Sequence, residues 1–259
     1  MSPKSLPLIA SKPVPAIVAA VLLVASTAVA RTESSRQVIL PAADGVAVSA
    51  TLSSAEVGAG NSGGGRPIVV LFHQAGGSGA EYDAIVPHLL KSGFETLAVD
   101  QRSGGSGFGR ANRTAERLGR PASFLEALPD LKAAVAWAEA RAAGRPVVIW
   151  GSSYSASLVF LVAAADPKVA GVVSFSPGEY FGRSAPVAEA AAHVSQPIFV
   201  SSASDRGEVA AARAILAAAP AKDKVQVVPK NAGHGSIALA GSGGADVWPA
   251  LDRFLARFR

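Results

Sequence analysis

The chain has 259 residues, no cysteine and a formal net charge of +5. Its hydrophobic content of 49% is enough for a well-filled core, which excludes a disordered protein, and the absence of cysteine excludes disulfide bonds and thiolate chemistry. The basic side chains are scattered, apart from a small group of arginines between residues 110 and 120. Neither a nucleic acid nor an anionic membrane surface is therefore an expected partner.

The first residues have the pattern of an export signal. Lys4 and Lys12 precede an apolar stretch that ends in the small-x-small sequence Ala28-Val29-Ala30. We expect cleavage after Ala30, which divides the chain into a signal peptide, residues 1–30, and a single domain, residues 31–259. The mature protein is then periplasmic or secreted, with no stable membrane insertion. The alternative is an uncleaved N-terminal anchor, because the apolar run is close to the shortest length that spans a bilayer.

The rest of the chain begins with a hairpin pattern and then alternates strand and helix patterns. Residues 37–52 alternate loosely around Asp44-Gly45, which favours two antiparallel strands. Short β-branched runs typical of buried strands occur at residues 68–72, 96–99, 147–150, 172–175, 198–200 and 225–228. Helical patterns occur at residues 80–90, 124–141, 154–165, 209–218 and 245–258. This order predicts an α/β fold, with a mainly parallel central sheet, helices on both faces and an N-terminal antiparallel hairpin.

The segment around Ser153 is the most informative in the chain. An apolar strand runs into Gly151-Ser152-Ser153-Tyr154-Ser155, and a helix follows. This is the strand–turn–helix context of a nucleophile elbow, G-x-S-x-G, with serine in place of the last glycine. Both flanking positions must be small because strand and helix pass close together there, and serine is small. The segment predicts Ser153 as a nucleophile, and the alternative is an ordinary turn with a serine N-cap.

A serine nucleophile needs a positioned base, and the chain offers four histidines. His234 lies between two glycines in a loop after the last predicted strand, where its imidazole can reach the elbow. His88 and His193 belong to helical patterns. His73 follows the first parallel strand and is expected to orient its loop. We therefore predict His234 as the base.

The base needs a carboxylate that fixes its tautomer and stabilises the imidazolium. Asp205 follows the strand at residues 198–200 and lies between Ser153 and His234, in the chain order Ser…Asp…His. We predict Asp205 as this acid, with Glu179 and Glu208 as alternatives. A plain structural role for Asp205 is that of a helix N-cap.

An acyl-transfer site also needs donors for the developing oxyanion. The backbone N–H of Tyr154, directly after the nucleophile, is one predicted donor. The second is the N–H of Gln74, in the glycine-rich loop that follows the first parallel strand. Aromatic side chains at Phe108, Tyr154, Tyr180 and Phe181 are candidates for lining an apolar pocket.

These motifs resemble the α/β-hydrolase superfamily, in particular its small lidless members of the dienelactone-hydrolase-like type. The resemblance runs from about Val38 to Phe258 and is carried by Leu71–Gly77, Val99–Gly105, Gly151–Ser155, Ser202–Asp205 and Gly233–Gly235. It implies hydrolysis of a small-molecule ester or related acyl bond through an acyl-enzyme, with no metal or organic cofactor. Dienelactone hydrolase itself uses a cysteine nucleophile, which this chain lacks, so its lactone substrate is not carried over.

Two other functions fit parts of the sequence. Gly77-Ser78-Gly79 after one strand and Asp100 at the end of the next approximate the fingerprint of a dinucleotide-binding oxidoreductase, but Tyr82 occupies the third glycine position. A non-catalytic envelope binding module on the same scaffold is the other alternative, because a fold does not guarantee an activity. The ordered set of serine, carboxylate and histidine favours the hydrolase.

Overall fold

The computed structural model describes residues 33–55 and 66–259. The predicted signal peptide, its cleavage site and the boundary at residue 31 lie outside the described residues. Within the described ranges, no helix combines the length and the apolar character that crossing a membrane requires.

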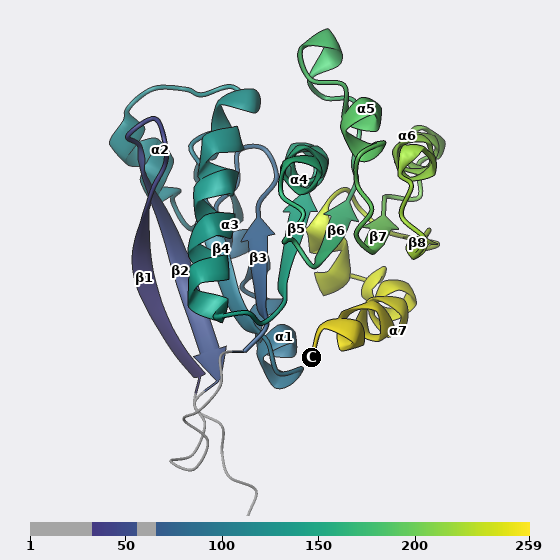
Figure 1. Cartoon of the computed structure of the whole chain (residues 1–259), viewed down its shortest axis with the longest axis horizontal. Coiled ribbons are helices and arrows are strands. Elements are labelled where there is room, and N and C mark those ends of the chain that lie inside the picture. The colour runs from purple at the N-terminus through teal and green to yellow at the C-terminus, as the bar shows by residue number, and fades with distance from the viewer. Residues whose placement is uncertain (1–32, 56–65) are drawn as a thin grey trace, which may run out of the picture. The chain divides into compact units, whose positions relative to one another are not determined.

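One sheet of eight strands organises the described residues, in the order β1-β2-β4-β3-β5-β6-β7-β8 (Figure 1). The hairpin of β1 (Glu33–Pro41) and β2 (Ala47–Ala55) is antiparallel, and β2 pairs antiparallel with β4. All remaining pairs are parallel. The other strands are β3 (Ile68–Phe72), β4 (Glu95–Asp100), β5 (Val147–Ser152), β6 (Gly171–Phe175), β7 (Ile198–Ser201) and β8 (Lys224–Val227). The predicted fold class, a mainly parallel sheet with an N-terminal hairpin, is confirmed.

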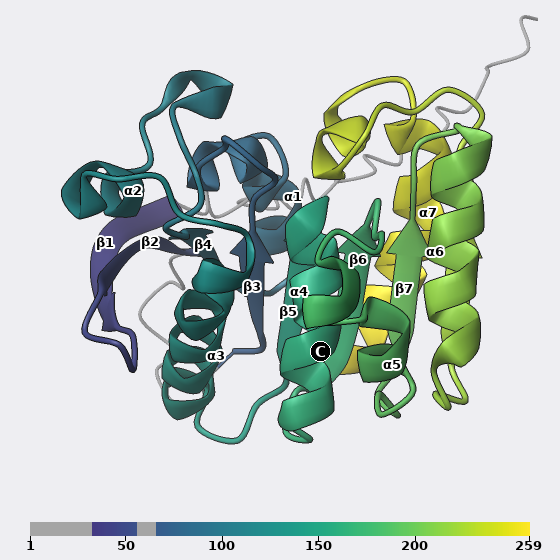
Figure 2. The same cartoon turned by 90° about the horizontal axis from the view of Figure 1, so that it is seen from above.

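Helices cover both faces of this sheet (Figures 1 and 2). One face is packed by α3 (Leu128–Ala142), α4 (Tyr154–Ala165), α5 (Val187–Ala191) and α6 (Arg206–Ala218). The other face is packed by α1 (Val86–Lys91) and α7 (Gly244–Leu255). The short helix α2 (Arg113–Leu118) lies beside β2 and β4.

Strand β3 shows why the apolar runs are unbroken. Ile68, Val70 and Phe72 belong to the core under α3 and α4, whereas Val69 and Leu71 belong to the core under α1 and α7. Successive side chains of a strand point to opposite faces, so a strand covered on both sides must be apolar at every position. The same pattern identified most of the strands from the sequence.

The structure differs from expectation at the predicted helix 80–90. Gly79–Tyr82 forms a 3₁₀ turn, and α1 begins only at Val86, with a proline in its first turn. Proline has no N–H and cannot continue a helix from the preceding residues, so the pattern is split in two. Two short helices, α2 and α5, occur in connections where the sequence showed no helical period.

Candidate active site

The elbow at Ser153 joins β5 to α4 at the carboxyl edge of the sheet. Ser153 has φ 58° and ψ −125°, a conformation that costs energy for any residue except glycine and that persists only where the surroundings enforce it. Its N–H donates to the carbonyl oxygen of Phe175 on the neighbouring strand at 2.8 Å. The strained turn lifts the serine hydroxyl out of the sheet edge.

The residues on either side of the elbow explain why its motif tolerates a serine. A Cβ added at Gly151 would overlap the carbonyl oxygen of Ser155, so glycine is needed there. Ser155 donates from Oγ to the carbonyl oxygen of His73 at 2.7 Å and accepts from Gln101 Nε2 at 2.6 Å. The serine that replaces the last glycine therefore ties the start of α4 to the loops that follow β3 and β4.

The structure brings the predicted nucleophile and base together. His234 Nε2 lies 2.7 Å from Ser153 Oγ, and His234 Nδ1 lies 2.8 Å from Glu208 Oε1. Because a carboxylate faces Nδ1, that nitrogen carries the proton, and Nε2 is free to accept the proton of the serine. Gly235 has φ 79°, which lets the chain turn sharply after His234.

The acid assignment from the sequence is corrected here, because Glu208 and not Asp205 faces His234. Asp205 is the N-cap of α6, and its Oδ1 accepts from the N–H groups of Gly207 at 2.8 Å and Glu208 at 3.2 Å. Its side chain is therefore turned toward the helix. Glu208 lies in the first turn of α6, and its longer side chain spans the distance to the imidazole.

The third candidate, Glu179, has a structural role. Its carboxylate accepts from the N–H groups of Val187 at 2.7 Å and Ala188 at 2.8 Å, at the start of α5. A carboxylate is a natural partner for the free N–H groups at a helix start. Glu179 thus fixes the loop after β6 and does not contribute to the constellation around Ser153.

The pKa of Glu208 follows from opposing effects. Burial raises it, but hydrogen bonds from His234 and Ser176, together with the charge of the imidazole, outweigh burial and lower the pKa below its ordinary value. Glu208 is therefore ionised at neutral pH. An ionised carboxylate at this position holds the Nδ1 tautomer and stabilises the imidazolium that forms when Nε2 is protonated.

The oxyanion donor predicted at Gln74 also needs correction. The N–H of Gln74 donates to Glu81 Oε2 at 2.7 Å and so points away from the reacting side. The chain turns directly after it, where the N–H of Gly77 donates to the carbonyl oxygen of Gln74 at 3.1 Å. Within the described ranges, the N–H groups of Ala75 and Tyr154 have no acceptor, which leaves both available to a ligand.

His73 behaves as a loop-orienting residue. Its buried ring places Nδ1 2.8 Å from the carbonyl oxygen of Gln74 and Nε2 3.0 Å from Asn112 Nδ2. Burial lowers the pKa of His73 to about 4, so the ring is neutral and both of its nitrogens are occupied. His73 therefore shapes the loop after β3 and is not a second base.

The aromatic candidates divide by exposure. Tyr154 and Phe181 are buried, and the hydroxyl of Tyr154 lies 2.6 Å from Ser103 Oγ, so this side chain belongs to the framework. Tyr180 and Phe108 remain exposed, at 39% and 38% of their surfaces. Tyr180 follows β6 and donates to the carbonyl oxygen of Ser176 at 2.9 Å. Of the four candidates, Tyr180 and Phe108 therefore offer the most exposed surface.

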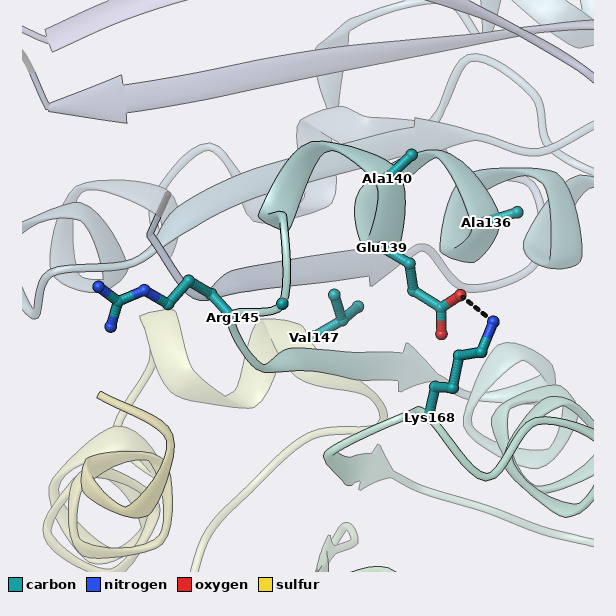
Figure 3. Close-up of a pocket in the computed structure, with 7 residues that line it drawn as sticks. Ala136, Glu139, Ala140, Arg145, Val147 and Lys168 are labelled. Carbon is teal, nitrogen blue, oxygen red and sulfur yellow. Dashed lines mark ion pairs between the residues drawn. The ribbon is translucent and has the colours of Figure 1, made fainter. Parts of the chain in front are cut away.

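A pocket of about 630 Å³ lies at the other end of β5 (Figure 3). It is lined by Ala136, Glu139, Ala140, Gly144, Arg145, Val147 and Lys168. Val147 begins β5, whereas Ser153 follows its last residue, so this pocket and the candidate site open at opposite edges of the sheet. The chemistry of the side chains, rather than the size of a cavity, locates the candidate site.

In the candidate dinucleotide-binding motif, backbone N–H groups of the protein itself bind the carboxylate of Asp100. Asp100 accepts through Oδ1 from the N–H of Gly79 at 2.8 Å and through Oδ2 from the N–H of Arg113 at 3.1 Å. A ribose would need these same oxygens. Among the described residues, no three His, Asp or Glu side chains are placed to hold a metal ion together.

This edge of the sheet has the architecture of the α/β hydrolases, in which a serine after a central strand meets a histidine from a loop after the last strand. Residues 64–227 match the model of a hydrolase family described as serine aminopeptidase, S33. The match covers more than half of the chain, includes Ser153 and Glu208, and ends before His234. The chain belongs to this family.

Solved structures of α/β hydrolases share the fold. A dienelactone hydrolase from Anabaena variabilis superimposes with a TM-score of 0.67 at 17% identity, over 87% of this chain and 98% of its own. An esterase from Pyrococcus furiosus superimposes with a TM-score of 0.67 at 17% identity, over 87% of this chain and 93% of the esterase. A cold-adapted esterase from an Arctic intertidal metagenomic library superimposes with a TM-score of 0.62 at 19% identity, over 88% of this chain and 95% of the esterase. No curated protein sequence matches the chain.

Proposed function

We propose that this hydrolase cleaves carboxylic esters of small molecules through an acyl-enzyme. Ser153 is the nucleophile, His234 the general base and Glu208 the acid that orients it. The observation that carries the proposal is the continuous hydrogen-bonded chain from Ser153 Oγ to His234 Nε2 at 2.7 Å and from His234 Nδ1 to Glu208 Oε1 at 2.8 Å.

In the first half of the reaction, Ser153 Oγ attacks the ester carbonyl carbon while His234 Nε2 takes its proton. The N–H groups of Tyr154 and Ala75 donate to the negative oxygen of the tetrahedral intermediate. When the C–O bond breaks, the imidazolium gives its proton to the leaving alkoxide, and an alcohol departs. Water then attacks the acyl-enzyme by the same steps in reverse order, which releases the carboxylic acid and free Ser153.

The surrounding carboxylates favour an ester over the N-terminal residue of a peptide. An aminopeptidase must hold the ammonium group of its substrate, and a free carboxylate near the nucleophile is the usual means. Near Ser153 and His234, Glu81, Glu179 and Glu208 accept hydrogen bonds from this chain through both oxygens, whereas the exposed Asp205 accepts only through Oδ1. The solved structures described as esterases and dienelactone hydrolases also support ester cleavage.

Covalent labelling tests the proposal directly. A fluorophosphonate should label Ser153, because it forms a tetrahedral adduct at the activated serine. Ser153→Ala should lose both the label and the hydrolysis of p-nitrophenyl esters. Ser92→Ala, at the far edge of the sheet after α1, is the matched control and should keep both.

Two outcomes would refute the proposal. A folded wild-type protein that takes no label and cleaves no ester would favour a binding module on a hydrolase scaffold. Faster cleavage of amino-acid p-nitroanilides than of p-nitrophenyl esters would favour an aminopeptidase.

We also propose that the enzyme acts outside the cytoplasm, on the basis of the signal pattern before Arg31. The mature N-terminus should then be Arg31. Mass spectrometry of protein exported by its native host measures this, and retention of residues 1–30 would favour a membrane anchor.

A further inference from the structure

A second carboxylate lies beneath the candidate site. Glu81, in the 3₁₀ turn Gly79–Tyr82, is only 1% exposed. Its Oε1 accepts from the hydroxyl of Ser152 at 2.6 Å, and its Oε2 accepts from the N–H of Gln74 at 2.7 Å. Within the described part of the chain, no lysine or arginine forms an ion pair with it. Burying a carboxylate without a cation is costly, and such groups are found where they have a task.

The two partners of Glu81 belong to different loops of the site. Ser152 directly precedes the nucleophile, and Gln74 directly precedes Ala75 in the loop after β3. The hydroxyl of Ser152 also accepts from the N–H of Ser236 at 2.8 Å, two residues after the base. One carboxylate and one hydroxyl thus connect the elbow, the oxyanion loop and the base loop.

We propose that Glu81 is a positioning residue of the active site, whose two carboxylate oxygens hold these three loops in the arrangement that acyl transfer needs. The inference rests on the proposed function, because it concerns the same nucleophile and base. Placement errors of about 1 Å can cost roughly 100-fold in rate, so a bond network at this junction has a large influence on turnover.

The ionised form of Glu81 is the one that fits this role. Both of its oxygens accept hydrogen bonds, and the proton of the Ser152 hydroxyl points to Oε1 because Oγ accepts from Ser236. A proton on Oε1 would displace the Ser152 donor, and a proton on Oε2 would displace the N–H of Gln74. Protonation therefore breaks one of the two links that define the loop arrangement.

Burial makes this protonation accessible near neutral pH, since it raises the pKa of Glu81 to about 7. The hydrogen bonds from Ser152 and Gln74 and the charge of His234 act in the opposite direction. His234, from the loop after β8, and the phenol of Tyr82, from the same turn, are the titratable groups that act on Glu81. Full activity thus needs an ionised Glu81 together with a His234 that is free to accept a proton.

Glu81→Gln tests the proposal, with Glu95→Gln as the matched control. Glu95 is also a buried carboxylate, but it lies at the amino end of β4 and pairs with Arg141. For a neutral ester, Glu81→Gln should lower kcat by about 10- to 100-fold and change KM little, because positioning acts on the transition state. The acid limb of log kcat/KM against pH should fall from a slope near 2 to a slope near 1. Glu95→Gln should keep the wild-type kcat and slope.

Ser152→Ala provides an independent test, because it removes the link but keeps the carboxylate. It should lower kcat by a similar factor without changing the number of ionisations on the acid limb.

A folded Glu81→Gln protein with wild-type kcat and an acid limb of slope 2 would overturn the inference. If Glu81→Gln does not fold, a Ser152→Ala protein with kcat within about twofold of wild type would overturn it instead. Failure of the proposed function is distinguishable, because the wild-type protein would then take no fluorophosphonate label.

Discussion

Two buried carboxylates at opposite edges of the sheet, Glu95 and Glu81, are held in different ways. At the amino edge, Glu95 receives both Nε and Nη2 of Arg141, at 2.7 and 2.9 Å. At the carboxyl edge, Glu81 has only neutral donors, and Glu208 faces a histidine. Positive φ angles outside glycine are found at Ser153 and Ser176 on this edge, and also at Phe108 and at Ala143, which lies between α3 and the start of β5. Glu95 is held by a paired charge, as Asp130 is by Arg102 at the carboxyl edge, whereas Glu81 has no cation partner and lies beside the candidate nucleophile.

Replacing the proposed acid should give the largest effect on turnover. Glu208→Gln should lower kcat by about 10⁴-fold, because the imidazole loses the partner that fixes its tautomer and stabilises its charge. Asp205→Asn is the matched control and should keep kcat within about threefold, since its side chain caps α6. Steady-state hydrolysis of a p-nitrophenyl ester measures both. A large loss in Asp205→Asn with little change in Glu208→Gln would restore the assignment made from the sequence.

Adding a methyl group where the base loop contacts the elbow should have the next largest effect on turnover. A Cβ at Gly235 would lie 2.6 Å from Ser152 Oγ, and the φ of 79° is unfavourable for alanine. Gly235→Ala should therefore displace the base loop and lower kcat about 100-fold. Gly241→Ala, whose added Cβ would lie 3.8 Å from the carbonyl oxygen of Ala238, is the control. Equal kcat values for the two variants would contradict the close contact at Ser152.

The contrast between Glu81 and Glu95 should also be visible in stability against pH. The pKa of Glu81 is raised in the folded protein from 4.5 to about 7, so the folded state binds this proton more tightly than the unfolded state. Its stabilising contribution is complete below pH 4.5 and is lost as pH rises through 7. Relative to Glu81→Gln, the wild-type free energy of unfolding should fall by roughly 3 kcal/mol over this range.

Urea unfolding of both proteins at pH 5 and pH 8 measures this difference. Glu95→Gln again serves as the control, and it should be less stable than wild type because Arg141 loses its partner. A constant gap between wild type and Glu81→Gln at the two pH values would show that Glu81 does not titrate in this range.

The smallest expected effect concerns the cap of α6. Asp205→Ala removes two hydrogen bonds to the first turn and should lower the free energy of unfolding by about 1 kcal/mol. Thermal unfolding should show a decrease in Tm of a few degrees. A loss of activity with unchanged Tm would instead place Asp205 in the chemistry.

The fold was predictable, and the proposed nucleophile and base could be singled out, because their signals are local. Strands such as β3 are apolar throughout, and the elbow at Ser153 combines a strand, a glycine and a helix within a few residues. His234 was distinguished by the glycines on either side. These features depend on neighbours in the chain, and the sequence displays them directly.

The proposed acid, the proposed oxyanion donor and the position of Glu81 depended on geometry that the sequence does not display. Asp205 and Glu208 are three residues apart, and the choice between them depends on where α6 begins and how far each side chain reaches. The spacing Asp-x-x-Glu is typical of a helix start, and this signal favoured a capping role for Asp205. The prediction that the N–H of Gln74 is an oxyanion donor did not hold, because the direction of a backbone N–H is fixed by the turn after it. Glu81 was hidden in a helical pattern that the proline in α1 interrupts.

The strained conformation of Ser153 has a consequence for how the protein acquires its activity. A left-handed serine is unfavourable in an isolated peptide, so the elbow exists only after α4, β5 and β6 have docked and the Phe175 carbonyl has accepted its N–H. A partly folded chain therefore carries an inert serine. During refolding, covalent labelling of Ser153 should lag behind the recovery of helix content, which makes the probe a reporter of completed assembly at the centre of the sheet.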